Sequence, residues 1–196
     1  MEISVLFEGV DFIGSLPKGD VKEAYCDSRQ CTAGSLFVAV RGAEADGHTF
    51  IGKAIEKGAA YIVCEEIPAE CANAEGAEFI LVKESRKAVA RIAANFHDNP
   101  SHKIKIVAVT GTNGKTSVTH LIQKIMETNE QKCAIIGTLG YKLHSKGDYF
   151  EAKHTTPQAP ELQATLDKIL SNEIENVVME VSSHSLAQYR VKNCVF

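Results

Sequence analysis

The chain of 196 residues has no tryptophan, and aromatic residues make up only 7% of it. Basic residues are also few, because 21 lysines and arginines stand against 25 aspartates and glutamates, for a formal net charge of -4. Surfaces that bind nucleic acid are usually basic and often carry interleaved aromatic side chains. The sequence contains no such run, and we therefore expect no nucleic-acid partner.

The six cysteines include no C-x-x-C pair, the spacing typical of zinc sites and redox dithiols. Scattered cysteines of this kind favour reduced, mostly buried thiols over a disulfide framework. The first residues lack the basic and long apolar regions of a signal peptide, and no apolar run is long enough to span a membrane. These absences predict a cytoplasmic protein with no membrane partner.

The first half of the chain alternates strand-like and helix-like segments. Strands are predicted at 35–40, 60–64 and 79–82, and a short helix at 50–55. Ser85 is expected to cap the N-terminus of a helix whose buried face includes Val89, Ile92 and Phe96. The turn formers at 98–102 then mark a domain boundary. This pattern predicts a small N-terminal α/β domain over residues 1–100.

The second half, residues 101–196, repeats the same alternation. We predict a helix to about residue 128, a strand at 133–136, a helix at 160–170 and a strand at 177–181. Strands separated by helices indicate an α/β fold with a mainly parallel sheet. Ligands of such sheets bind beyond the carboxyl ends of the strands. The loops after Val109, Ile136 and Val181 should therefore converge on one site.

The most informative segment is 104–117, in which a β-branched apolar strand leads into the turn Thr110-Gly111-Thr112-Asn113-Gly114 and then into Lys115-Thr116. The residues that follow fall at the spacing of an amphipathic helix: Val118, Leu121, Ile122, Ile125 and Met126. A helix N-terminus offers free N–H groups and a positive dipole end to an anion, and glycines allow its close approach. We predict a nucleotide-phosphate-binding loop in a P-loop-type domain.

The spacing of this loop is unusual. Val109 stands where the common G-x-x-x-x-G-K-[ST] pattern has its first glycine, and the glycine comes two residues later at Gly111. The alternative is an ordinary strand-turn-helix connection. The apolar strand before the loop and the helix after it favour phosphate binding.

A carboxylate stands near the end of the otherwise apolar strand 176–181. A charge there is costly without a partner. If this strand lies beside the phosphate-loop strand, Glu180 would face Thr116 across the nucleotide phosphates and help to hold Mg²⁺. The alternative is a half-exposed glutamate paired with a lysine.

Three further polar segments have ordinary explanations beside a ligand-binding one. Thr155 and Thr156 precede the helix at 160, so taken alone they are expected to cap it. Asp27-Ser28-Arg29 could be a turn with a local salt bridge, and the histidines, His120 among them, show no metal-ligand spacing and are expected on the surface. The loop 182–190 has no G-x-S-x-G elbow, so polar ligand contacts are favoured over nucleophilic catalysis, and Arg190 offers a planar fork for carboxylate or phosphate.

Taken together, these motifs resemble the Mur ligase family, ATP-dependent amide-forming enzymes of peptidoglycan precursor synthesis. The loop 110–116 resembles that family's variant phosphate loop, including its spacing. Asp27-Ser28-Arg29, the stretch 34–42 and Asp46-Gly47-His48 resemble the first domain of the MurE and MurF branches. The segments 154–157 and 179–191 are similar to the MurE branch, so the resemblance covers nearly the whole chain.

The resemblance implies a ligase that joins UDP-N-acetylmuramoyl-L-alanyl-D-glutamate to a diamino acid, meso-diaminopimelate or L-lysine, through an acyl phosphate, with ATP and Mg²⁺. Lys115 would be the catalytic residue at the β- and γ-phosphates, and Thr116 and Glu180 would serve Mg²⁺. The nucleotide would contact Gly111, Thr112, Asn113, Gly114, Lys115, Thr116 and Ser117. The UDP-sugar-dipeptide would contact Ser28, Thr155, Thr156, Ser182, Gln188 and Arg190.

Ligases of this family have three domains, and the resemblance stops partway through the central, ATP-binding one. The first domain would bind UDP, and the third domain, which would hold the diamino acid, is absent, so we expect no ligase turnover from these 196 residues alone. One alternative is a non-catalytic module that binds a UDP-sugar or nucleotide. Another is a different Mur-type ligase, MurF or folylpolyglutamate synthase, against which Thr155-Thr156-Pro157 and Ser182-Ser183-His184 argue.

Overall fold

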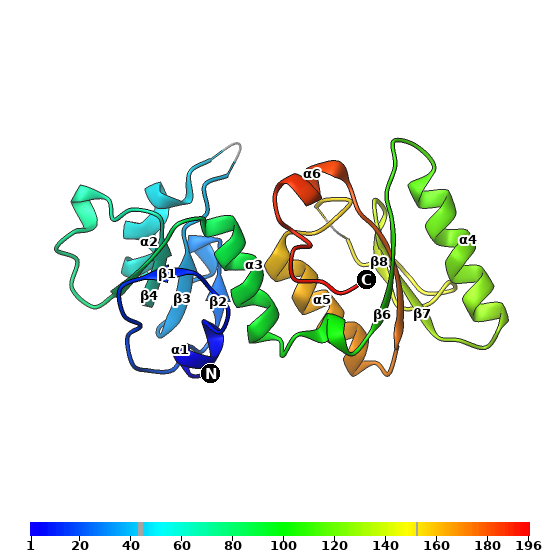
Figure 1. Cartoon of the computed structure of the whole chain (residues 1–196), viewed down its shortest axis with the longest axis horizontal. Coiled ribbons are helices and arrows are strands. Elements are labelled where there is room, and N and C mark those ends of the chain that lie inside the picture. Colours follow the sequence, from blue (N-terminus) through cyan, green and yellow to red (C-terminus); the bar gives the residue numbers. More distant parts are fainter. Residues whose placement is uncertain (43–44, 152) are drawn as a thin grey trace. The chain divides into compact units, whose positions relative to one another are not determined.

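The computed structural model describes residues 1–42, 45–151 and 153–196. They form two compact units, unit 1 (Met1–Phe96) and unit 2 (His97–Phe196), each with one β-sheet and helices packed on it (Figure 1). Parallel pairs dominate both sheets, so the predicted α/β class with mainly parallel sheets is confirmed. Within the described ranges, no helix is long and apolar enough to cross a membrane.

Unit 1 has a five-stranded sheet with the order β1-β5-β4-β3-β2, in which only β1 runs antiparallel to its neighbour. Its strands are β1 (Phe12–Ile13), β2 (Ala24–Tyr25), β3 (Ser35–Val38), β4 (Ala59–Cys64) and β5 (Glu78–Val82). Its α-helices are α1 (Ile3–Leu6), α2 (Ile51–Glu56) and α3 (Ser85–Phe96). Three short 3-10 turns complete it: η1 (Ser28–Gln30), η2 (Gly47–Phe50) and η3 (Ala69–Cys71).

The sheet of unit 1 is buried on both faces. Leu36 of β3 packs with Ile92 of α3 in one apolar cluster, whereas Phe37, the next residue along the strand, packs with Ile51 of α2 in another. Successive strand residues point to opposite faces, so a strand covered on both sides needs a continuous apolar run. This explains why the strands could be recognised as unbroken apolar segments.

The predicted N-cap at Ser85 is wrong, because Ser85 is the first residue of α3 and not the residue before it. Its backbone N–H and its hydroxyl both donate to Oε1 of Glu65, at 2.9 and 2.8 Å. Glu65 follows β4, so its carboxylate accepts both bonds from the start of the helix. A charged acceptor binds donors more strongly than a neutral one does, which accounts for the orientation of Ser85.

Unit 2 has a four-stranded sheet with the order β6-β9-β7-β8, parallel except for the hairpin partner β8. Its strands are β6 (Lys105–Val109), β7 (Cys133–Gly137), β8 (Gly140–Lys142) and β9 (Asn176–Glu180). Its helices are η4 (Pro100–His102), α4 (Lys115–Thr128), α5 (Ala159–Ser171) and α6 (Ser183–Ala187). In the predicted turn segment 98–102, Asp98 and Asn99 have positive φ values of 54° and 49°.

Helix α5 buries an apolar face against the sheet, whereas the apolar residues of α4 are only partly buried. Of the five apolar residues at helical spacing, Ile122 and Met126 are half-buried, and three are exposed: Val118 (42%), Leu121 (63%) and Ile125 (61%). The residues of α4 that are buried are Thr119 and Gln123, and the Gln123 amide donates to the carbonyl of Cys133 on β7 at 2.9 Å. The predicted helix is therefore confirmed, and its buried side includes polar residues.

The cysteines carry no disulfide. All six are free thiols, and four of them are buried: Cys31, Cys64, Cys71 and Cys133. Burial raises the pKa of Cys64 to about 12 and that of Cys133 to about 11. Thiols with raised pKa values are poor nucleophiles, and these two serve as small apolar core residues.

Candidate functional site

The predicted phosphate loop connects the carboxyl end of β6 to the N-terminus of α4. Gly111 and Gly114 have φ values of 143° and 79°, a region that side chains with a Cβ rarely adopt. Gly114 is the N-cap of α4, and no side chain caps the helix. The first N–H groups of a helix have no intrahelical partner, so these point into the loop. The loop therefore offers backbone donors and a positive dipole end to an anion.

Lys115, the first residue of α4, lies over this loop. Its Nζ donates to the backbone carbonyls of Gly111 at 2.8 Å and Thr112 at 3.3 Å. The ammonium group is thus held above the same turn that presents the backbone N–H groups. A point charge in this position is suited to phosphate.

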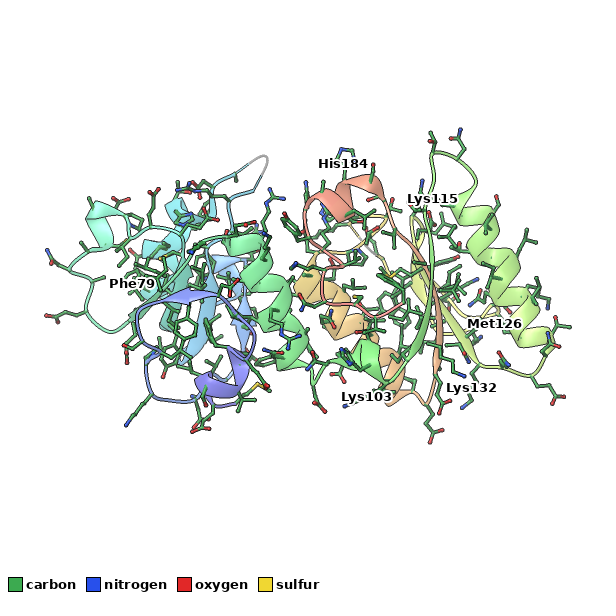
Figure 2. The ribbon with its side chains drawn as sticks, viewed as in Figure 1. Phe79, Lys103, Lys115, Met126, Lys132 and His184 are labelled. Carbon is green, nitrogen blue, oxygen red and sulfur yellow. The ribbon has the colours of Figure 1, made fainter. Side chains whose placement is uncertain are left out.

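Strand β9 lies directly beside β6, with Glu180 paired in register with Val109. The role predicted for Glu180 required its strand to lie beside the phosphate-loop strand, and it does. The end of β9 therefore adjoins the start of the phosphate loop. Figure 2 shows Lys115 and His184, which follow β6 and β9, at one end of unit 2. Lys103 and Lys132, which precede β6 and β7, lie at the opposite end.

Glu180 is buried, with 1% of its surface exposed, so the alternative of a half-exposed glutamate is wrong. Its Oε1 accepts from the backbone N–H of Thr138 and its Oε2 from the Thr138 hydroxyl, both at 3.1 Å. The lysine partner of that alternative is also missing, because within the described ranges no Lys, Arg or His forms an ion pair with this carboxylate.

This environment fits a divalent cation better than a structural ion pair. A buried carboxylate without a countercharge is costly, and two hydrogen bonds leave lone pairs free on its oxygens. Among the described residues no group of three or more His, Cys, Asp and Glu side chains is placed to hold a metal. Mg²⁺ is usually held by one or two carboxylates together with waters and substrate phosphates, so one carboxylate beside a phosphate loop suits it.

The two threonines do not cap α5, whose N-cap is Gln158 and which has no side-chain cap. The Thr156 hydroxyl donates to the backbone carbonyl of Glu180 at 2.9 Å and accepts from the N–H of Ser182 at 3.1 Å. The Thr155 hydroxyl lies 3.1 Å from that of Thr138. Capping was wrong because the end of β9 and the residue after β7 provide the partners of these hydroxyls, and neither is near in sequence.

Three residues of the loop after β9 are brought to the same place. Arg190 donates from Nη1 to the Thr156 carbonyl at 2.8 Å, and from Nε and Nη2 to Oε1 of Gln188 at 3.0 and 2.7 Å. Ser182 is the N-cap of α6, and its hydroxyl accepts from the Ser185 N–H at 3.1 Å. Unit 2 thus gathers every residue predicted there for metal and substrate at the carboxyl ends of β6, β7 and β9.

Ser28 belongs to unit 1 and is described there by itself. It is buried, and it begins η1 after Asp27, whose carboxylate forms a bidentate pair with Arg29. The segment is therefore a turn with a local salt bridge. It also lines an open cavity of about 420 Å³ together with Phe50 and Lys53. A turn and a ligand contact are compatible at this position.

Three residues at this site were not predicted from the sequence: Gly137, Thr138 and His120. Sequence reasoning pointed to the loop after Ile136 but named neither Gly137 nor Thr138, although both follow a buried parallel strand. It also placed His120 on the surface. His120 is half-buried, its Nδ1 lies 2.9 Å from the Thr116 carbonyl, and its Nε2 lies 2.6 Å from the hydroxyl of Tyr149.

Tyr149 lies close to the carboxylate site as well. Burial and the negative charge of Glu180 raise the pKa of Tyr149. Because the Thr116 carbonyl can only accept, His120 carries its proton on Nδ1, and the Tyr149 hydroxyl donates to Nε2. This relay ties the start of α4 to the segment after β8. No local pattern could have shown it, since the two segments are far apart in the sequence.

Comparisons with known proteins identify the family of the chain. The model of the Mur ligase family catalytic domain matches residues 20–97, and that of the Mur ligase middle domain matches residues 109–196. A UDP-N-acetylmuramoyl-L-alanyl-D-glutamate--2,6-diaminopimelate ligase of Geobacter sulfurreducens is 44% identical over 178 residues, which are 90% of this chain and 34% of that protein. The enzyme of the same name from Clostridioides difficile is 39% identical over 200 residues, covering 100% of this chain and 40% of its own length.

Solved structures show the same fold. A UDP-N-acetylmuramoyl-L-alanyl-D-glutamate--2,6-diaminopimelate ligase matches with a TM-score of 0.79 at 24% identity, over 99% of this chain and 38% of its own. MurF from Acinetobacter baumannii matches with a TM-score of 0.59 at 20% identity, over 92% of this chain and 35% of its own. The chain therefore spans between about a third and two fifths of the length of these proteins.

Proposed function

The chain belongs to the Mur ligase family, and from this we propose that it provides the nucleotide-binding and UDP-substrate-binding parts of an ATP-dependent amide ligase. The reaction that fits best is the one in the names of its relatives, in which a diamino acid is joined to UDP-N-acetylmuramoyl-L-alanyl-D-glutamate. This is a step of peptidoglycan precursor synthesis. The diamino acid would be meso-diaminopimelate or L-lysine, and the names of the relatives favour the former.

The proposed chemistry has two steps. An oxygen of the substrate carboxylate forms a bond to the γ-phosphorus of ATP as the bond from that phosphorus to ADP breaks. The amine of the diamino acid then forms the amide bond as inorganic phosphate leaves and the amine loses a proton. Phosphoryl transfer of this kind depends on positioning and on cationic stabilisation more than on a protein nucleophile.

The observation that carries the proposal is the register of β6 and β9. It sets the buried Glu180 beside Val109, the last residue before the phosphate loop. A carboxylate and a phosphate-binding turn at the same sheet edge are what a magnesium nucleotide requires. Without a cation, burying the Glu180 carboxylate would cost free energy that nothing at the site offsets.

We assign the residues as follows. Lys115 contacts the β- and γ-phosphates, and Gly111, Thr112, Asn113, Gly114, Thr116 and Ser117 surround the nucleotide with backbone and hydroxyl donors. Thr116 and Glu180 would hold Mg²⁺, which supplies positive charge to the transferring phosphoryl group.

The UDP-sugar-dipeptide is assigned to Ser28 of unit 1 and to a set of unit 2 residues: Thr155, Thr156, Ser182, Gln188 and Arg190. Arg190 supports this role most directly, because Gln188 and the Thr156 carbonyl hold its guanidinium in a fixed plane. A fixed guanidinium fork suits a carboxylate or phosphate group of a ligand.

Calorimetric titration of UDP-N-acetylmuramoyl-L-alanyl-D-glutamate tests the substrate half of the proposal. We expect Arg190→Ala to weaken binding by about 10-fold or more, since a hydrogen bond to a charged group contributes about 1.5–3 kcal/mol. Lys132→Ala is the matched control, because Lys132 lies at the opposite end of the sheet and its side chain is 64% exposed. Equal affinity of wild type and Arg190→Ala would remove Arg190 from the substrate site.

A further inference from the structure

We propose that Thr138 is a positioning residue that fixes the Glu180 carboxylate in the orientation in which it receives a divalent cation. The inference rests on the proposed function and deepens it, because it names a residue that acts on the metal site through another side chain. Thr138 is the first residue after β7, and its hydroxyl lies 3.1 Å from both Oε2 of Glu180 and the hydroxyl of Thr155.

Thr138 holds both oxygens of the carboxylate at once. Its backbone N–H reaches Oε1 and its hydroxyl reaches Oε2, each at 3.1 Å. One bond alone would leave the carboxylate plane free to rotate, because the terminal torsion of a glutamate side chain is broad and soft. Two bonds from one residue fix that plane. The N–H is present whatever the side chain, so the hydroxyl is the part that a substitution can remove.

The direction of the hydrogen bonds follows from proton counting. An ionised carboxylate can only accept, and a threonine hydroxyl has a single proton to donate. The Thr138 hydroxyl therefore donates to Glu180, and the Thr155 hydroxyl, 3.1 Å away, donates to Thr138. The two hydroxyls therefore point their protons toward the carboxylate, and its remaining lone pairs stay available to a cation.

The residue before Thr138 makes room for this arrangement. A Cβ built on Gly137 would lie 2.2 Å from Oε1 and 2.8 Å from Cδ of Glu180. Any side chain there would push the carboxylate away from the Thr138 N–H. Gly137 and Thr138, which we call the carboxylate seat, therefore act together: the first admits the carboxylate and the second orients it.

The carboxylate seat, Gly137 and Thr138, provides no positive charge to the Glu180 carboxylate. Glu180 is 1% exposed, and in the described part of the chain no cationic side chain pairs with it. Neutral donors oriented on a buried carboxylate resemble the outer-shell partners that orient metal ligands elsewhere, and their loss typically weakens metal binding by about 10–100-fold. This gives the size of the effect to be expected.

The test measures ADP affinity by calorimetry, once with Mg²⁺ and once with a chelator. We expect Thr138→Val to weaken ADP binding by about 10-fold in Mg²⁺ and by less than about 2-fold without it, since the phosphate loop is untouched. Thr138→Ser, which keeps the hydroxyl, should behave as wild type. Thr165→Val is the matched control, because the Thr165 hydroxyl donates only to the Glu161 carbonyl within α5.

The outcomes separate the inference from the proposed function. If ADP binding depends on Mg²⁺ to the same extent in wild type and in Thr138→Val, the positioning role alone is overturned. Equal losses with and without Mg²⁺ would also overturn it, because they indicate a purely structural residue. No ADP binding by wild type, or binding indifferent to Mg²⁺, would overturn the nucleotide site and the inference with it. Thr138→Ala, which adds no apolar methyl beside the carboxylate, replaces Thr138→Val if that variant does not fold.

Discussion

Helices α4 and α5 cover opposite faces of the same sheet in unit 2, and they pack on it in different ways (Figure 1). On α5, Leu162, Leu166 and Ile169 are fully buried at 0% exposure. On α4, Leu121 and Ile125 are exposed by 63% and 61%, and polar residues face the sheet. Both helices have a regular apolar period in the sequence. A regular apolar period therefore predicts a helix without showing which of its sides is inside.

The two helices also differ in what they do for the site. Helix α4 begins with Lys115 at the phosphate loop, and its buried Gln123 fixes it to β7 through one side-chain hydrogen bond. Helix α5 follows Thr155 and Thr156 and provides the apolar core against β6, β7 and β9. We therefore assign most of the stability of unit 2 to α5 and the phosphate contacts to α4. The same substitution made on each of the two helices tests this assignment.

The largest difference is expected for a leucine on each helix. Leu166→Ala should lower the free energy of unfolding by about 3 kcal/mol, because it removes a buried side chain and leaves a cavity. Leu121→Ala should lower it by less than about 0.5 kcal/mol, as for other exposed positions. Urea unfolding followed by circular dichroism measures both. Similar losses for the two variants would show that Leu121 is buried in solution and that α4 packs through its apolar residues as α5 does.

A smaller difference is expected for a glutamine on each helix. Gln123→Leu should cost about 1–2 kcal/mol, because it removes the donor to the Cys133 carbonyl from a buried position. Gln163 of α5 is buried too, but its Nε2 donates only to the weak acceptor Sγ of Cys194 at 3.5 Å, and among the described residues its Oε1 has no hydrogen-bond partner. Gln163→Leu should therefore be neutral or stabilising in the same unfolding experiment. A larger loss for Gln163→Leu than for Gln123→Leu would reverse the comparison.

The smallest effect is expected at Glu127 in the last turn of α4, whose Oε1 accepts from the Ser145 N–H at 2.7 Å. Burial raises the pKa of Glu127, but the hydrogen bonds from Ser145 and the charge of Lys124 outweigh it, so the net pKa lies below the ordinary 4.5. A lowered pKa contributes stability above about pH 4.5 that is lost as the pH falls through the folded value. Glu127 is half-buried, so solvent still screens part of these interactions, and the contribution is at most about 0.5 kcal/mol.

Thermal unfolding of wild type and Glu127→Gln across acidic and neutral pH measures this contribution. Wild type should be the more stable protein at neutral pH, and the difference should vanish in acid. A difference that grows as the pH falls would contradict the sign of the shift. It would mean that α4 is not held at this end by an ionised Glu127.

The sequence predicted the parts of the fold that local patterns determine. The strand, loop and helix of 104–128 appear as expected, because a buried apolar run, two glycines and a helical period each act within a few residues. The two-residue strands β1 and β2 were not predicted, since a pair of residues has no period to detect. The edge hairpin partner β8 was also missed, because its three residues are too few to show a period.

The location of the candidate site could be predicted from the sequence, but the contacts between its residues could not. The rule that parallel strands end at one edge pointed to the loops after Val109, Ile136 and Val181. Thr138 was not named, because its importance comes from a carboxylate 42 residues away. His120 was assigned to the surface for a similar reason, since its partner Tyr149 lies 29 residues along the chain. The roles assigned to the site residues remain predictions that ligand binding has to test.

The central claim is that the loop 110–116 binds the phosphates of a nucleotide, and titration of ADP with Mg²⁺ into wild type and Lys115→Ala tests it most directly. Wild type should bind, and Lys115→Ala should bind at least about 10-fold more weakly, because it loses a charged donor to phosphate. Lys132→Ala, the control at the opposite end of the sheet, should bind as wild type does. Absence of binding by wild type, or equal binding by wild type and Lys115→Ala, would contradict the account.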